Sequence, residues 1–90
     1  MNDTALDGLA LRRRRLLYRS WRRGMKEVDL LLGRFADAQL EAMSGDELDR
    51  FEDLLARPDP DIFGWVMGSL EVPPGVDKAL IGLIRNMNND

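Results

Sequence analysis

The sequence predicts an all-α protein, a small five-helix bundle that forms a single helical domain over residues 1–90. Apolar residues recur at intervals of three and four, and no segment shows the period-two alternation typical of a half-buried strand. Glycines, prolines and capping sequences divide the chain into five such stretches. A chain of this length supports one hydrophobic core, and folding buries only about 60% of the surface that the unfolded chain exposes.

The first helix is expected from Ala5 to Arg22. With about 100° between successive residues, its apolar residues fall on one face: Leu6, Leu9, Ala10, Leu16, Leu17 and Trp21. Arg12, Arg15 and Arg19 fall on the opposite face. Arg13 falls within the apolar face, so its guanidinium must extend to solvent or find a partner.

Gly24 separates this helix from a second one, which is expected to begin near Met25. The apolar face of the second helix consists of Val28, Leu31, Leu32 and Phe35. Gly24 is predicted to form the chain reversal, because glycine adopts positive φ at no steric cost. Gly33 weakens a helix by roughly 1 kcal/mol relative to alanine. We therefore expect the helix to bend or end early, with residues 36–43 as a looser extension.

Capping sequences mark the third helix. Ser44 and Glu47 have the spacing of a capping box, in which each side chain accepts a hydrogen bond from the other residue's backbone amide. Leu48, Phe51 and Leu55 continue its apolar face. The helix is expected to end at Arg57, because the residue before a proline is pushed out of the α region.

Prolines delimit the last two helices. Asp59 is predicted to cap the fourth helix, with Pro60 at its first position. Its expected apolar face comprises Ile62, Phe63, Val66, Met67 and Leu70, whereas Trp65 lies away from the middle of that face. Residues 73–75 forbid continuation, so a fifth helix begins near Val76. The tail, residues 86–90, is expected to fray.

Composition excludes several classes of function. The chain contains no histidine and no cysteine, which excludes zinc sites of the usual kind, cysteine nucleophiles, Ser–His relays and disulfides. No apolar run approaches the ~18 residues of a membrane span, so no membrane insertion is expected. The N-terminus also lacks the apolar block of a secretory signal. We expect a cytoplasmic protein that is not an enzyme.

Charge is distributed unevenly along the chain. The net charge is −3, yet basic residues crowd the stretch 12–26, and acidic residues predominate over 37–61. The run Arg12–Arg15 has three interpretations: a solvated face, a nucleic-acid-binding helix, or a docking patch for an acidic protein surface. The overall acidity and the lack of a recognition-helix arrangement disfavour nucleic acid, and we favour the docking patch.

Two ordered segments carry a resemblance to a known family. Residues 15–29 contain the pattern RGxxE at Arg23, Gly24 and Glu27, and residues 59–65 form an acidic, proline-containing, aromatic segment. Together with the helices between them, these segments resemble the SdhE-type flavinylation factors, the FAD assembly factors of succinate dehydrogenase. The resemblance covers about residues 12–67. A five-residue pattern alone is weakly specific, so the second segment matters.

The resemblance implies a function. Members of this family bind the flavoprotein subunit of succinate dehydrogenase, and in some bacteria that of fumarate reductase, and promote covalent attachment of FAD to a histidine of that subunit. FAD is then carried by the partner, since this chain has no histidine to accept it. Whether the chain touches FAD directly, which flavoproteins it serves and whether it is monomeric stay open. A nucleic-acid-binding protein and a helical adaptor unrelated to flavin are the alternative functions.

The resemblance also implies a partner-binding site. Its centre would be Arg23, Gly24, Met25 and Glu27, and the surrounding residues would be Arg22, Asp29, Asp59 and Trp65. Five of these residues have a structural alternative. Arg23 and Glu27 have the spacing of a helical ion pair, Gly24 suits a C-cap, Asp59 suits an N-cap, and tryptophans usually belong to a core. No catalytic, cofactor-binding or metal-binding residues are predicted.

Overall fold

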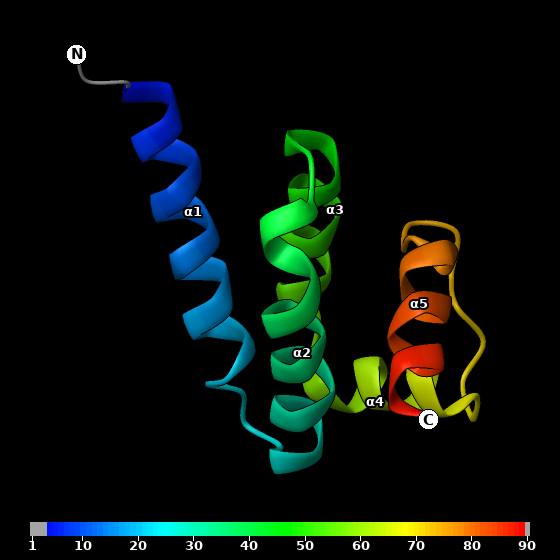
Figure 1. Ribbon diagram of the computed structural model, residues 1–90. Coiled ribbons are helices and arrows are strands. Elements are labelled where there is room, and N and C mark those ends of the chain that lie inside the picture. Colours follow the sequence, from blue (N-terminus) through cyan, green and yellow to red (C-terminus); the bar gives the residue numbers. More distant parts are fainter. Residues whose placement is uncertain (1–3, 90) are drawn as a thin grey trace.

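The computed structural model describes residues 4–89, with side chains from residue 8 onward. This part of the chain contains five α-helices and one 3₁₀ turn and no strand, so the predicted all-α, five-helix fold is confirmed (Figure 1). The elements are α1 (Thr4–Ser20), α2 (Lys26–Gln39), η1 (Leu40–Ala42), α3 (Gly45–Leu55), α4 (Asp59–Met67) and α5 (Lys78–Asn88).

The central element is α2, which packs against α1, α4 and α5, while α1 also contacts α3 (Figure 1). The rings of Phe35 on α2 and Phe51 on α3 meet at a centroid distance of 5.6 Å. Every helix contributes fully buried apolar side chains to the same cluster, among them Leu16, Leu32, Leu48, Ile62, Val66 and Ile84. One core therefore holds the helices, as a chain of this length allows.

Gly33 does not shorten α2, which continues to Gln39 before the 3₁₀ turn. The looser segment is limited to the 3₁₀ turn Leu40–Ala42, and the expected early end is wrong because Gly33 is a packing residue. A Cβ atom at this position would lie 2.3 Å from ring atoms of Trp21. The absence of a side chain lets the indole at the end of α1 lie directly on α2.

Gly24 does not adopt positive φ, so that prediction is wrong. Among the described residues, Gly68 alone has a positive φ, 86°, and it ends α4 after Met67. Because α4 ends there, Met67 and Leu70 are half exposed rather than part of the apolar face. Trp65 takes their place in the core with 5% of its surface exposed.

Other helix ends agree with the sequence in part. The capping box of Ser44 and Glu47 is present, with both reciprocal hydrogen bonds. The fifth helix begins after Asp77, whose carboxylate accepts hydrogen bonds from the amides of Ala79 and Leu80. It continues to Asn88, and Asp90 lies outside the described residues, so the expected fraying of the tail stays a prediction.

Candidate functional site

Two turns meet at the end of α1. Arg23 belongs to the connection between α1 and α2, and Asp59 opens α4. The Arg23 Nε donates to Asp59 Oδ1 over 2.8 Å, and the two side chains are only 12% and 11% exposed. The alternative, an ion pair of Arg23 with Glu27, is therefore wrong, because the guanidinium points toward Asp59.

The remaining donors of Arg23 bind backbone carbonyls at the end of α3. Nη1 donates to the Leu55 oxygen over 2.6 Å, and Nη2 donates to the Arg57 oxygen over 2.9 Å. The last carbonyls of a helix have no partner within the helix, so a nearby arginine is a suitable C-terminal cap. Arg23 thus fastens the α1–α2 connection to the end of α3.

The sequence predicted that Asp59 caps its own helix, α4. This prediction is wrong. Pro58 takes the N-cap position of α4, and Asp59 Oδ2 instead accepts from the amides of Gly24, over 2.6 Å, and Met25, over 3.0 Å. Those amides lie directly before α2, so Asp59 caps a helix more than thirty residues away in sequence. We call Arg23, Gly24, Met25, Asp29 and Asp59 the Arg23–Asp59 node. Asp29 joins it by accepting a hydrogen bond from the Arg23 amide.

The node keeps the Asp59 carboxylate ionised. Burial raises the pKa of this carboxyl group, but the Arg23 hydrogen bond, the Met25 amide, the charge of Arg23 and the Gly24 amide act in the opposite direction. The opposing contributions are larger in sum, and they hold the pKa of Asp59 below its ordinary value.

Gly24 is required by close approach rather than by its φ angle. A Cβ atom at this position would lie 3.2 Å from Asp59 Oδ2, closer than ordinary van der Waals contact. The carboxylate cannot easily yield, because its other oxygen binds Arg23. A side chain at position 24 would therefore disturb the node.

The predicted site residues divide into an exposed and a buried group. Arg22, Gly24 and Glu27 are exposed, and Met25 is half buried against the core. Arg23, Asp29 and Asp59 are held within the node. Trp65 lies in the core, and its carbonyl accepts from Arg85 Nη2 over 2.6 Å, so its indole adds no open surface to the site.

Sequence reasoning missed Tyr18, which is 60% exposed on α1. The Arg22 guanidinium lies over its ring, with Cζ 4.5 Å from the centroid. The two residues are four apart, the spacing of neighbours on a helix surface, and they lie opposite the apolar face. That spacing was a usable signal.

The arginine run divides in the same way. Arg12 donates to Asp49 over 2.6 Å and to Glu52 over 2.8 Å, which ties α1 to α3. Arg13, expected within the apolar face, donates to the carbonyls of Leu40 and Met43 over 3.0 and 2.9 Å. Arg14 and Arg15 are exposed. Half of the run is therefore used inside the fold.

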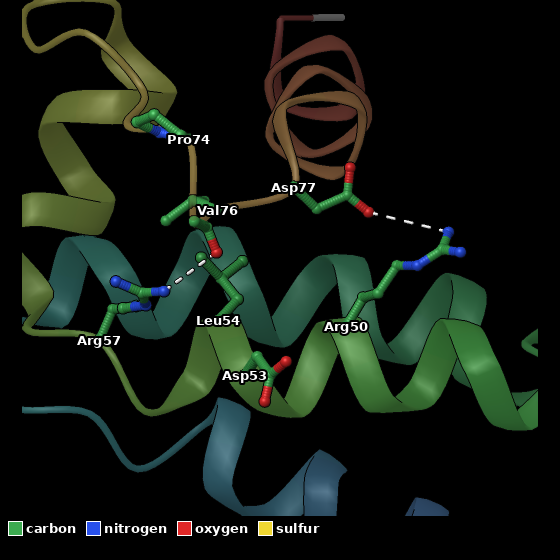
Figure 2. Close-up of a pocket in the computed structure, with 8 residues that line it drawn as sticks. Arg50, Asp53, Leu54, Arg57, Pro74, Val76 and Asp77 are labelled. Atoms are coloured by element: carbon green, nitrogen blue, oxygen red, sulfur yellow. Dashed lines mark hydrogen bonds and ion pairs between the residues drawn. The ribbon is translucent and has the colours of Figure 1, made fainter.

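A cavity of about 340 Å³ lies on the other side of Arg57 (Figure 2). One face of α3 and the loop before α5 line it: Arg50, Asp53, Leu54, Arg57, Pro74, Gly75, Val76 and Asp77. The Arg57 Nη2 donates to the Gly75 oxygen over 3.1 Å, so Arg57 connects this loop to the Arg23–Asp59 node. Its two arginines and two aspartates give the lining no net formal charge, and we assign no cofactor to it.

The described residues offer little for other kinds of site. Within them, no group of three or more His, Cys, Asp or Glu side chains is placed to hold a metal ion. None of the helices in this part of the chain combines the length and apolar character needed to cross a bilayer.

Comparison with known proteins identifies the family. The family model described as flavinator of succinate dehydrogenase matches residues 14–88. Three relatives are similar along most of this chain. The FAD assembly factor SdhE of Acetobacter pasteurianus is 38% identical over 89 residues, which covers 99% of this chain and 79% of that protein.

The other two are mitochondrial succinate dehydrogenase assembly factor 2 proteins. That of Dictyostelium discoideum is 40% identical over 74 residues, 82% of this chain and 52% of that protein. That of Komagataella phaffii is 46% identical over 68 residues, 76% of this chain and 36% of that protein. The chain thus spans most of the bacterial relative but about half or less of the two mitochondrial ones. The resemblance seen at RGxxE is confirmed, and the chain belongs to the succinate dehydrogenase flavinator family.

Proposed function

We propose that this chain is an assembly factor that binds the flavoprotein subunit of succinate dehydrogenase and promotes covalent attachment of FAD to it. Family membership supports this function, together with the similarity to the Acetobacter FAD assembly factor along 99% of the chain. The flavoprotein subunit of fumarate reductase is a second proposed client. The cytoplasm is the proposed compartment.

The proposed mechanism is conformational rather than catalytic. The chain has no histidine, the acceptor proposed for the flavin and the side chain that most often transfers protons near neutral pH. A factor that binds one arrangement of the flavoprotein more tightly than others increases the population of that arrangement. If that arrangement holds the flavin against its acceptor histidine, proximity accelerates a reaction that the flavoprotein itself performs. FAD is carried by the flavoprotein, with no covalent bond to this chain.

The Arg23–Asp59 node carries the proposal at the level of residues. It fixes the connection between α1 and α2, so that Arg22, Gly24, Met25 and Glu27 are presented at one end of the bundle. We assign these four residues to the contact with the flavoprotein. Arg23, Asp29, Asp59 and Trp65 support that surface from behind. A preorganised contact loses less conformational freedom on binding.

Flavinylation in cells tests this function. Cells that lack the chain are supplied with the wild type, Gly24→Arg, Glu27→Gln or Gly45→Arg. Covalent flavin in the flavoprotein subunit is then measured by fluorescence in a denaturing gel. Gly45 is the matched control, because it is exposed at a helix start and a Cβ there meets nothing within 4 Å.

We expect the wild type and Gly45→Arg to restore the fluorescent band, and Gly24→Arg to fail. Glu27→Gln leaves the node intact, so a weakened band with this variant identifies Glu27 as a contact. A full band in cells without the chain, with the flavoprotein well expressed, would refute the proposed function.

A further inference from the structure

The arginines of α1 and the turn after it form two groups. Arg12, Arg13 and Arg19 meet carboxylates or backbone carbonyls of α3 and the segment after α2. Arg14, Arg15 and Arg22 make no hydrogen bond or ion pair with any described side chain or backbone group, and all three are exposed. The second group is therefore free to bind something outside the chain.

The free arginines share one face with two other exposed residues. With about 100° per residue, Leu11, Arg14, Arg15 and Tyr18 of α1 fall within an arc of about 100°. Arg22 follows the end of the helix at Ser20 and joins them through its contact with the Tyr18 ring. The opposite direction holds Leu16 and Ser20, both of which are buried. We call these five residues the outer face of α1. Its helical part, from Leu11 to Tyr18, extends for about 10 Å along the helix axis.

The chemistry of the outer face is that of a protein contact. Leu11 is 45% exposed and Tyr18 60%, and the Arg22 guanidinium is already stacked on the Tyr18 ring. Tyrosine and arginine are the residue types that most often dominate the binding energy of interfaces. Between Gly8 and Arg23 the sequence contains no acidic residue, so nothing on this stretch neutralises the guanidinium groups.

We propose that the outer face of α1 is a docking surface for an acidic segment of the flavoprotein client. This inference rests on the proposed function. It adds a second contact surface beside the one assigned to Arg22, Gly24, Met25 and Glu27, and Arg22 belongs to both surfaces. The net charge of the chain is −3, yet basic residues crowd residues 12–26, and this uneven distribution would orient an acidic partner on approach. Carboxylates of the partner would pair with the guanidinium groups, and an apolar side chain would pack on Tyr18 and Leu11.

A nucleic acid fits the outer face less well. Three guanidinium groups are fewer than the roughly 6–10 phosphate contacts of a protein whose affinity for nucleic acid is strongly salt-dependent, and α3 beside α1 is acidic. Asp49 and Glu52 of α3 already bind Arg12, so these two carboxylates are not free to pair with the outer face of a second copy.

Binding of the purified flavoprotein subunit to the full chain tests the inference. The test variant is Arg14→Gln combined with Arg15→Gln. Its control is Arg34→Gln combined with Lys78→Gln, which removes the same number of charges from exposed positions on α2 and α5. A third variant, Tyr18→Ala, removes the exposed ring without changing charge. Far-UV circular dichroism establishes that each variant is folded.

We expect the dissociation constant to rise about tenfold for the test variant at low ionic strength, since two exposed ion pairs are lost. Its salt dependence should also be weaker than that of the wild type. Tyr18→Ala should weaken binding at all salt concentrations, and the control pair should bind within about twofold of the wild type.

Equal affinities and equal salt dependence for the test and control pairs overturn the inference while the proposed function stands. The inference is also overturned if the test pair loses only self-association, measured by sedimentation, or only binding to an RNA or DNA duplex. Failure of the wild type itself to bind the flavoprotein removes the proposed function, and the inference with it.

Discussion

Replacing Asp59 with asparagine should destabilise the protein far more than an ordinary surface substitution. The carboxylate accepts three hydrogen bonds, from Arg23 Nε, the Gly24 amide and the Met25 amide. Asparagine keeps one acceptor oxygen and places an NH₂ group where the other oxygen was. Whichever way the amide is turned, at least one donor of the node faces another donor.

The expected magnitude follows from burial. A buried donor left without an acceptor costs about 1–3 kcal/mol. Breaking a fully buried ion pair costs about 3–5 kcal/mol, and the 12% and 11% exposure of these side chains reduces that contribution only in part. We therefore expect the free energy of unfolding to fall by about 2–4 kcal/mol. Small domains have a total stability of about 5–15 kcal/mol, so a loss of this size leaves the variant mostly folded.

Urea unfolding followed by far-UV circular dichroism measures this loss as a shift of the midpoint at unchanged slope. Asp53→Asn is the matched control, because Asp53 is exposed on α3 and should change stability by no more than about 0.5 kcal/mol. A double-mutant cycle with Arg23→Gln isolates the pairwise energy. If Asp59→Asn unfolds at the same urea concentration as Asp53→Asn, the reasoning about the node is refuted.

Three other predictions concern stability. The lowered pKa of Asp59 gives stability that is present above the unfolded pKa of about 3.8 and is lost as the pH falls through the lower folded pKa. Urea unfolding at neutral pH and below pH 3.8 measures this loss, which should be smaller for Asp59→Asn than for the wild type. Gly33→Ala should destabilise the protein by about 1–3 kcal/mol, because the added Cβ clashes with Trp21. Gly82→Ala should stabilise it by about 0.5–1 kcal/mol, because a Cβ there meets nothing within 4 Å. Thermal melts that give the opposite order of stability would contradict this. Ser44→Ala should cost about 1 kcal/mol by the same melts, and an unchanged midpoint would show that the capping box contributes nothing.

The sequence predicted what depends on local spacing. The five helices follow from apolar periodicity, and the capping box from the interval between Ser44 and Glu47. The family resemblance rested on short ordered segments, and the comparisons confirm it. Features of this kind can be found because neighbours in the helix are three or four positions apart in the chain.

What the sequence could not predict depends on contacts between distant segments. Asp59 before a proline has the appearance of an N-cap, but its partners lie 34 to 36 residues away. Gly33 has the appearance of a helix breaker until Trp21 is placed against it. Periodicity placed Arg13 within the apolar face, but it could not name the partners of the guanidinium, which are the carbonyls of Leu40 and Met43 after α2. The predicted site residues are therefore not all at the surface. Arg23, Asp59 and Trp65 lie inside the fold.

The inward position of Arg23 affects how loss-of-function variants should be understood in cells. A substitution at Arg23 or Gly24 weakens the native state, and destabilised proteins are removed by proteases, so the cellular level of the chain falls. Overproduction would offset part of that defect. A substitution at Glu27, which is exposed and outside the node, leaves the level unchanged, and extra copies only partly offset a weaker contact. Measuring protein abundance beside flavinylation therefore separates variants that lower the cellular level of the factor from variants that lower its affinity for the flavoprotein.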